Sequence, residues 1–395
     1  MRILHVVTAF PRSPDDVIVP WLVELLKRLR AAGHEVEVFT SAYRGGGNRE
    51  LAGIPVHRFR YFPDRWEDLT HDEAAPDRMR RSLRYRVMPL FYVLGGLWAM
   101  WRLCRRNRYD IVHVHWPVPN ALFGSVARRG CGARLVTSWY GVELRWVKGG
   151  LSPLRRFAVW ALRTSDQVVA ISSYTAREIA ELSPVPVRVI PYTLGFGDAD
   201  ERSVAAPARD HLEVLFVGRL VERKGVRYLI DAVRTLAPRR AVHLTIIGDG
   251  PERPALASQV QAAGLDGAVD LRGRVSDAEL RQAYAAASVF VLPAIVDSRG
   301  DTEGLGVVLL EAMSYGVPVV GSRLGGITDI VVDGESGLLV EPSDPAALAG
   351  ALERLAGDPA LARRLGAAGR QRVADQFSWR AILAAWQECY AAVVR

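Results

Sequence analysis

The chain has 395 residues, of which 49% are hydrophobic and 24% are charged, and its formal net charge is +8. This length predicts two domains, and the composition is that of a soluble globular protein. The positive charge favours anionic partners, namely nucleotides, phosphates, nucleic acid or an acidic membrane surface. The three cysteines, at positions 104, 131 and 389, have neither the spacing of zinc ligands nor a disulfide pattern. The sequence therefore argues against a zinc site and for a reducing compartment.

Neither a targeting segment nor a membrane-spanning segment is expected. The N-terminal apolar run is too short for a signal peptide, and Ile3–Val7 is predicted to form the first strand. The longest apolar run, Val87–Trp101, has 15 residues and contains Pro89, Gly95 and Gly96. Because a spanning helix needs roughly 20 apolar residues, we expect a cytoplasmic protein without a transmembrane segment.

In the first half of the chain, short β-branched runs alternate with longer helical patterns, which predicts parallel βαβ units. The helical patterns include Trp21–Ala32 and Ala121–Arg129. The predicted strands are Ile3–Val7, Val36–Thr40, Ile111–Val114, Arg134–Thr137, Gln167–Ile171 and Val187–Ile190.

The alternation stops at Gly195–Arg209, a polar stretch rich in Gly, Pro and Ala, which is typical of a linker. It then restarts for the second half of the chain. Predicted strands there are Glu213–Val217, Val242–Ile247, Ala268–Leu271, Val289–Leu292, Pro318–Val320 and Leu338–Val340. Predicted helices are Val226–Leu236, Asp277–Ala286, Leu305–Tyr315, Pro345–Leu355 and Ala360–Gln371.

This organisation predicts an α/β protein with two Rossmann-like, doubly wound parallel-sheet domains that face each other across a cleft. The first domain is expected at residues 1–195, the linker at 196–211 and the second domain at 212–375. The aromatic-rich helix at 376–395 has no strand of its own, so we expect it to pack back on the first domain. Open parallel sheets bind ligands at the carboxyl ends of their strands, which predicts a site in the cleft.

The most distinctive motif places two glutamates, Glu303 and Glu311, eight residues apart around Gly304 and Gly306. On one helix this step rotates the second side chain by about 80°. The two carboxylates therefore converge on one ligand only if Glu303 lies on the loop and Glu311 two turns into the helix. The glycines permit close backbone approach, and free N–H groups at the helix start suit a phosphate. Alternatively, both are solvated acids at a helix start, where acids are favoured.

Basic residues follow the first strand of the second half. The strand ends at Gly218, and Arg219 and Lys224 then flank the turn into a helix. Arginine offers a planar fork for phosphate oxygens and lysine a mobile point charge. A solvated basic turn is the alternative.

Two weaker segments follow neighbouring strands. Gly248 opens a tight glycine turn at a strand end, and Arg274 and Val275 precede the predicted helix cap, Ser276 or Asp277. The backbone of Arg274 and Val275 could lie against the edge of a nucleotide base.

Together these four segments resemble the retaining GT-B glycosyltransferases of family GT4, and the resemblance covers nearly the whole chain. Glu303 and Glu311 are similar to the paired-glutamate motif of that family, and Arg219 and Lys224 to its diphosphate-binding pair. The resemblance implies that Glu303 contacts the transferred sugar and Glu311 the ribose. It also implies that Gly304, Leu305 and Gly306 supply backbone amides, and that the enzyme needs no metal or other cofactor.

In the first half, the segment Tyr109–Trp116 resembles the strand of this family that ends in a cleft histidine. By that resemblance His115 lies near the sugar and the departing phosphate, where a histidine can donate a proton as charge develops. The alternative is a buried histidine whose nitrogens are satisfied by the protein, which is the favoured interpretation for His113.

Two segments depart from the family pattern on the acceptor side. Many relatives carry a Gly-Gly pair after the first strand, but Phe10–Pro20 contains no glycine. Relatives often have His-Gly where this chain has Tyr140-Gly141. We name Trp116, Tyr140 and Glu143 as candidate acceptor-side residues, and the departures indicate either an unusual acceptor or drift.

The segment 78–108 holds nine arginines and no acidic residue, and its apolar part, Val87–Trp101, lies between the two basic clusters. Basic flanks around an aromatic and apolar segment suit docking on an anionic bilayer. The alternative is a long helix that buries its apolar face on the first sheet. A third reading, nucleic-acid binding, has no recognised motif to support it.

With this resemblance, the features predict transfer of a hexosyl group from a UDP- or GDP-sugar to an acceptor hydroxyl, such as one on a lipid-linked or cell-envelope glycan. Retention at the anomeric carbon is what the resemblance implies. The residues that the resemblance places in catalysis are His115, Arg219, Lys224 and Glu303. Two alternatives stay open: a GT-B-type epimerase or phosphorylase, and a non-catalytic sugar-nucleotide-binding protein.

Overall fold

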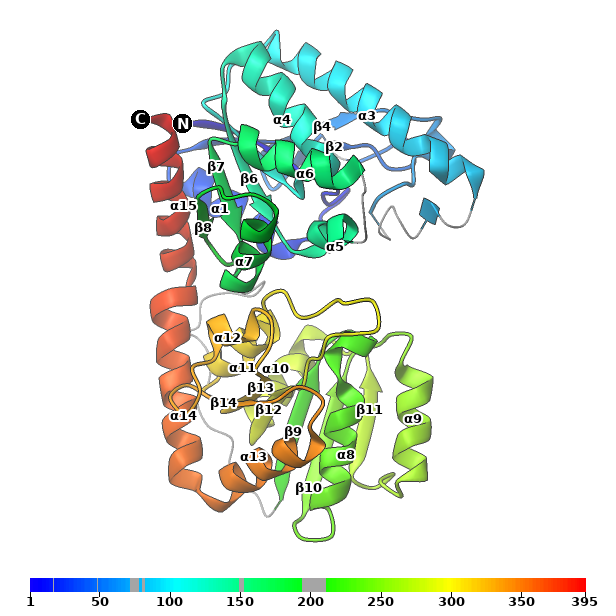
Figure 1. Ribbon diagram of the computed structural model, residues 1–395, viewed down its shortest axis with the longest axis vertical. Coiled ribbons are helices and arrows are strands. Elements are labelled where there is room, and N and C mark those ends of the chain that lie inside the picture. Colours follow the sequence, from blue (N-terminus) through cyan, green and yellow to red (C-terminus); the bar gives the residue numbers. More distant parts are fainter. Residues whose placement is uncertain (17, 48, 72–77, 80–81, 149–152, 194–210) are drawn as a thin grey trace. The chain divides into compact units, whose positions relative to one another are not determined.

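The computed structural model describes residues 1–16, 18–47, 49–71, 78–79, 82–148, 153–193 and 211–395 (Figure 1). The chain separates into two compact units. The first contains Met1–Ile171, Thr175–Ile190 and Leu383–Arg395, and the second contains Ser172–Tyr174 and Pro191–Ile382. The predicted linker lies outside the described residues, apart from its last residue.

The first unit is built on an eight-stranded sheet with the order β3-β4-β2-β1-β5-β6-β7-β8. All pairs are parallel except β3–β4, which is antiparallel. The strands are β1 (Arg2–Val6), β2 (Glu35–Ser41), β3 (Glu50–Leu51), β4 (Ile54–Phe59), β5 (Ile111–His115), β6 (Arg134–Trp139), β7 (Gln167–Ala170) and β8 (Val187–Val189). The central strand β5 is buried at every position, as a parallel strand with both faces covered must be.

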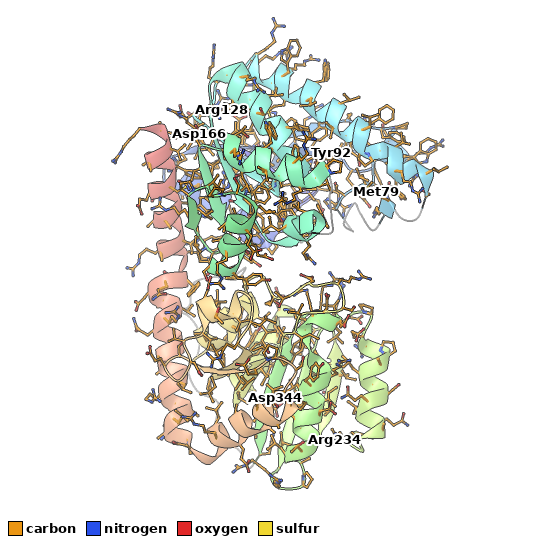
Figure 2. The ribbon with its side chains drawn as sticks, in the orientation of Figure 1. Met79, Tyr92, Arg128, Asp166, Arg234 and Asp344 are labelled. Carbon is orange, nitrogen blue, oxygen red and sulfur yellow. The ribbon has the colours of Figure 1, made fainter. Side chains whose placement is uncertain are left out.

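Helices cover this first sheet. They are α1 (Pro20–Ala31), α3 (Leu83–Cys104), α4 (Pro117–Cys131), α5 (Val142–Lys148), α6 (Pro153–Thr164), α7 (Ser173–Leu182) and the C-terminal α15 (Trp379–Val394). Helices α3 and α4 lie side by side (Figure 1) and share one core with β1, β2 and β4. Tyr92 points from α3 into this core (Figure 2), where its hydroxyl donates to Asn120 Oδ1 at 3.1 Å.

The second unit is a six-stranded, wholly parallel sheet with the order β11-β10-β9-β12-β13-β14. Its strands are β9 (Leu212–Val217), β10 (Val242–Ile247), β11 (Val269–Gly273), β12 (Val289–Leu292), β13 (Val319–Ser322) and β14 (Leu338–Val340). Its helices are α8 (Val226–Leu236), α9 (Arg253–Ala262), α10 (Asp277–Ala286), α11 (Val307–Ser314), α12 (Ile327–Ile330), α13 (Pro345–Gly357) and α14 (Pro359–Arg372). The prediction of two doubly wound parallel-sheet domains is confirmed.

Local capping explains why several helices start where they do. Ser276 accepts from the N–H of Glu279 while the Glu279 carboxylate accepts from the N–H of Ser276, so α10 begins with a complete capping box. Asp344 caps α13 by accepting from the N–H of Ala347 at 2.9 Å (Figure 2).

The apolar run Val87–Trp101 lies within a longer helix. Helix α3 is 22 residues long, and by length and composition alone it could span a bilayer. Pro89, Gly95 and Gly96 do not end this helix. The helix instead continues through Pro89, and Gly96 lets Phe123 of α4 pack against its backbone.

Candidate active site

At the carboxyl edge of the second sheet, an ionic cluster forms around Glu303. Lys224, at the end of the short 3-10 helix η3 (Glu222–Lys224) after β9, places Nζ 2.5 Å from Glu303 Oε2. Arg223 Nη1 donates to the same oxygen at 3.0 Å, and Arg223 Nε lies 3.4 Å from Asp301 Oδ2. Lys224 and Glu303 are only 7% and 8% exposed. Two of the predicted site residues are therefore in direct contact.

The charge state of Glu303 follows from this cluster. Burial by itself would raise the pKa of a carboxyl group, because a charge is poorly solvated inside the protein. The positive charges of Lys224 and Arg223 more than offset this, so the pKa of Glu303 is lowered. Glu303 is therefore a carboxylate that accepts hydrogen bonds, and it is not a proton donor at neutral pH.

The loop from Glu303 leads directly into α11, as the motif predicted. Helix α11 starts at Val307, with Gly306 as its N-cap, and Glu311 is its fifth residue. Glu311 thus lies just over one turn into the helix, not two turns as expected. No described residue accepts a hydrogen bond from the amides of Gly304, Leu305 or Gly306. These three N–H groups are available to an anionic ligand.

Glu311 is partly exposed and is oriented by a second helix. The hydroxyl of Tyr284, on α10, donates to Glu311 Oε2 at 2.6 Å. Tyr284 is itself buried and stacks on Tyr315 with ring centroids 5.6 Å apart. This hydrogen bond orients the Glu311 carboxylate.

The other predicted donor residues lie at neighbouring strand ends. A Cβ on Gly248 would sit 1.9 Å from the carbonyl oxygen of Gly218, so the ends of β9 and β10 approach closely only because residue 248 is glycine. The N–H of Gly248 donates to the carbonyl of Gly273 at 2.8 Å. Arg274 and Val275 follow Gly273 directly, so they lie beside the end of β10. A Cβ on Gly218 would lie 3.6 Å from Lys224 Cε, so the end of β9 lies next to the ionic cluster.

Arg219 is placed differently from Lys224. It is exposed, whereas Lys224 is buried against Glu303. Sequence reasoning also passed over Arg223 and Asp301, which complete the cluster. Arg223 could have been suggested by its position next to Lys224 in the same turn. In a turn with several charged residues, however, the sequence does not show which side chain points into the protein.

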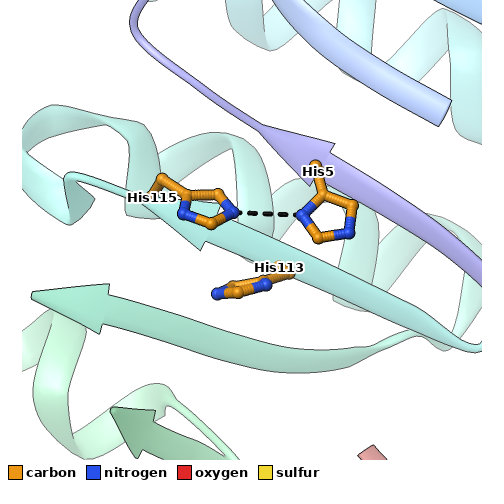
Figure 3. Close-up of side chains that lie close together, drawn as sticks. All are labelled: His5, His113 and His115. Carbon is orange, nitrogen blue, oxygen red and sulfur yellow. Dashed lines mark hydrogen bonds between the residues drawn. The ribbon is translucent and has the colours of Figure 1, made fainter. Parts of the chain in front are cut away.

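In the first unit, three histidines from adjacent strands form a buried cluster, which we call the histidine cluster: His5, His113 and His115 (Figure 3). Each is 0% exposed. His5 Nδ1 lies 3.0 Å from His115 Nε2, and the His113 and His115 rings are 4.0 Å apart. β1 and β5 are paired in register, with His5 opposite His113. Sequence analysis missed His5, because a histidine inside a first strand has no motif around it.

The two nitrogens of His115 are both engaged inside the unit. Nδ1 is 2.7 Å from the Tyr140 hydroxyl and Nε2 faces His5. His113 pairs with the Tyr390 hydroxyl of α15 at 2.8 Å and with Ser138 Oγ at 2.7 Å. Both ring nitrogens of His113 therefore have hydrogen-bond partners in the protein, which agrees with the interpretation favoured for this residue. His115 must exchange one contact before it can reach a substrate.

The histidine cluster is neutral at neutral pH and is the only group of potential metal ligands within the described ranges. Burial lowers the pKa of His5 to about 3 and those of His113 and His115 well below the ordinary value. The ligand nitrogens lie within 4.8 Å of one another. Neutral imidazole is the form that binds metals, but a cation here would displace the existing hydrogen bonds. The bonds to tyrosine and serine already account for the arrangement around His113 and His115.

The remaining acceptor-side candidates gather beside His115. Trp116 stacks on Tyr140 with ring centroids 4.5 Å apart. Glu143 is fully buried and its Oε1 accepts from the N–H of Tyr140 at 2.8 Å, while Oε2 has no partner among the described residues. Burial raises the pKa of Glu143 to about 7. This side chain positions the Tyr140 backbone and is buried too deeply to touch a ligand directly.

Comparisons with known proteins bear on what these two units do. The family described as glycosyl transferases group 1 matches residues 198–372, and the family described as glycosyltransferase family 4 matches residues 20–192. The GDP-mannose-dependent alpha-(1-6)-phosphatidylinositol monomannoside mannosyltransferase of Mycolicibacterium smegmatis is 31% identical, over 83% of this chain and 88% of its own. The chain is a family 4 glycosyltransferase.

This glycosyltransferase also resembles proteins that are named for other activities. The glycogen synthase of Mycobacterium tuberculosis is 31% identical, over 100% of this chain and 95% of its own. The structure of HepE from Anabaena with UDP has a TM-score of 0.74 at 20% identity and covers 99% of this chain and 100% of its own. The predicted GT-B fold and the predicted family are confirmed.

Proposed function

We propose that this glycosyltransferase transfers a hexosyl group from a nucleoside diphosphate sugar to an acceptor hydroxyl, with retention at the anomeric carbon and without a metal. The observation that carries the proposal is the ionic cluster of Glu303, Lys224 and Arg223 beside the unpartnered amides of Gly304, Leu305 and Gly306. A carboxylate, two cations and free amides together match a sugar that carries a diphosphate.

Each group has a role in this reaction. Lys224, Arg219 and the amides at the start of α11 would stabilise the diphosphate as it gains negative charge on leaving. Glu303 would accept hydrogen bonds from sugar hydroxyls and hold the anomeric carbon in position for the acceptor. Glu311 would hold the ribose. Without a donor, Glu303 neutralises Lys224; with a donor, the diphosphate can share that lysine.

The names of the relatives support a nucleotide sugar as the donor, but they differ in the nucleotide and in the acceptor. The mannosyltransferase is named for GDP-mannose and a phosphatidylinositol mannoside, whereas the HepE structure contains UDP. We therefore propose a UDP- or GDP-sugar as the donor. A cytoplasmic position follows from this proposal, since that is where such donors are made.

A thermal-shift panel of UDP, GDP and ADP sugars tests donor binding. A ligand at about 100-fold excess over its Kd should stabilise the folded protein by roughly 3 kcal/mol. Lys224→Met should weaken binding of the preferred donor by about tenfold to 100-fold, because a charge-assisted hydrogen bond contributes about 1.5–3 kcal/mol. The matched control is Arg234→Met, which removes an exposed cation of α8 (Figure 2). Equal loss in both variants would contradict the assigned site.

The same panel, followed for product, separates the alternatives. Transfer or slow hydrolysis of a bound donor supports a glycosyltransferase site. A protein that binds a sugar nucleotide but never releases the nucleoside diphosphate would instead be a binding protein. Interconversion of the donor into an epimer would assign an epimerase.

We further propose that α3 docks on an anionic membrane and that the acceptor is lipid-linked. One face of α3 is buried, through residues such as Met88, Tyr92 and Met100. A second face, which we call the apolar stripe, is 43–74% exposed: Leu83, Val87, Leu90, Phe91, Leu94, Trp98 and Trp101. Arg84, Arg86, Arg102, Arg105 and Arg106 accompany it. An exposed apolar helix face with arginines is typical of an interfacial helix.

Co-sedimentation with vesicles of phosphatidylcholine and phosphatidylglycerol in equal amounts tests this docking. Phe91→Ser together with Leu94→Ser should weaken binding at least about tenfold, because burying each side chain contributes roughly 1.5–3 kcal/mol. The matched control replaces Leu154 and Val296 by Ser, since both are exposed apolar residues outside α3. Unchanged binding of the α3 variant would contradict membrane docking.

A further inference from the structure

Beside the C-terminal end of α3, the first unit contains an open hollow of about 560 Å³ that is separate from the ionic cluster and the histidine cluster. We call it the basic hollow. Its basic lining residues are Arg49, His57, Arg58, Arg60, Arg102 and Arg106, and none of the described residues that line it is acidic. We propose that the basic hollow binds the phosphate headgroup of an anionic phospholipid, while the acyl chains lie on the apolar stripe. This inference rests on the proposed membrane docking of α3.

Several of these cations are not neutralised by the protein. Arg49 and Arg106 have no acidic partner among the described residues, and Arg102 lies over the ring of Trp98 at 5.5 Å. The acids nearby pair with other lining residues: Glu37 with His57, and both Glu67 and Asp64 with Arg60. A net positive charge therefore faces the hollow, which favours an anion.

Arg58 adds a cation that is partly removed from water. It donates to the backbone carbonyls of Phe10 and Pro11, and an added Cβ on Gly47 would lie only 2.4 Å from its Nε. Burial lowers the pKa of Arg58 to about 10. A desolvated guanidinium at the base of a hollow is stabilised by a bound anion, and its planar fork matches phosphate oxygens.

The position of the hollow selects a lipid over a free anion. Trp98 and Arg102 lie one turn apart on the same face of α3, and Arg106 follows just after the end of the helix. Trp98 belongs both to the apolar stripe and to the lining of the hollow. A molecule that fills both surfaces has an apolar part and an anionic end. The volume also lies in the range of about 300–1,000 Å³ that is usual for small-molecule sites.

The test compares two double variants that remove the same charge. Arg49→Gln with Arg106→Gln changes the basic hollow. Arg86→Gln with Arg105→Gln changes two exposed arginines outside it, one in α3 and one at the C-cap of that helix. Binding is measured by co-sedimentation with vesicles of phosphatidylcholine alone and of phosphatidylcholine with phosphatidylglycerol. Circular dichroism melting checks that all variants fold.

We expect both pairs to lose affinity for the anionic vesicles, because each arginine near the surface contributes roughly a factor of five. The hollow pair should lose about tenfold more than the control pair, because only its guanidinium groups would donate charge-assisted hydrogen bonds to a bound phosphate. Equal losses would show a diffuse charge effect and overturn the headgroup site while leaving membrane docking intact. Inorganic phosphate that binds wild type but not the hollow pair, with unchanged vesicle binding, would assign the hollow to a free anion and also overturn it. If the Phe91 and Leu94 variant keeps full vesicle binding, the membrane docking itself fails.

Discussion

Replacing Glu143 by Gln should change how the stability of the protein depends on pH. In the folded protein the pKa of this buried carboxyl is about 7, against an ordinary value of 4.5. The folded state therefore binds a proton more tightly than the unfolded chain. Its stabilising contribution is present at low pH and is lost as the pH rises from about 4.5 through 7. At 1.36 kcal/mol per pKa unit, the full loss is about 3 kcal/mol.

Glutamine keeps an oxygen that can accept from the N–H of Tyr140 but cannot ionise. Relative to wild type, Glu143→Gln should therefore gain roughly 2.5 kcal/mol in unfolding free energy between about pH 5 and pH 8. Urea denaturation at a series of pH values measures this difference directly. A parallel pH dependence in both proteins would refute the reasoning, because Glu143 would then be solvated or paired in the folded state.

Three further predictions concern other parts of the chain. The histidine cluster is neutral, so stability should fall below about pH 6.5, and His5→Phe should reduce that slope by about 1.4 kcal/mol per pH unit in urea titrations. Tyr140→Phe removes the hydroxyl that contacts His115 Nδ1, so we expect kcat to fall while the KM for the donor changes little. An unchanged kcat would show that His115 has no role in catalysis. Ser276→Ala should cost about 1 kcal/mol of stability by breaking a capping box, and a melting temperature equal to wild type would contradict that.

Much of the donor half was predictable from the sequence. Helices α8 and α10 and strands β10, β12 and β14 have the predicted bounds, because a clear apolar pattern in each stops at a turn-forming or capping residue such as Gly225, Gly248, Ser276 or Pro293. The placement of Glu303 on a loop followed from its spacing to Glu311 and from the glycines between them. Such features depend on residues that are close in the sequence, so they can be predicted from a single sequence.

Other features depend on tertiary contacts that no local pattern records. Helix α3 extends beyond the apolar run at both ends, because packing of Tyr92 and Met100 in the core stabilises a helix through Pro89. Strand β4 was missed although it pairs along β2, since its sequence Ile54–Phe59 mixes proline, histidine and arginine. The cleft between the domains and the roles of the site residues stay predictions.

The central claim is that Glu303 serves the turnover of a nucleotide sugar. The most direct measurement is proton NMR of the reaction with the preferred donor, comparing Glu303→Gln with Glu353→Gln, an exposed glutamate of α13. We expect wild type and the Glu353 variant to release the nucleoside diphosphate and to form a product with the anomeric configuration of the donor. The Glu303 variant should turn over about 100-fold or more slowly, equivalent to roughly 2.7 kcal/mol of lost transition-state stabilisation. Equal rates in the two variants, or an inverted product, would contradict the account.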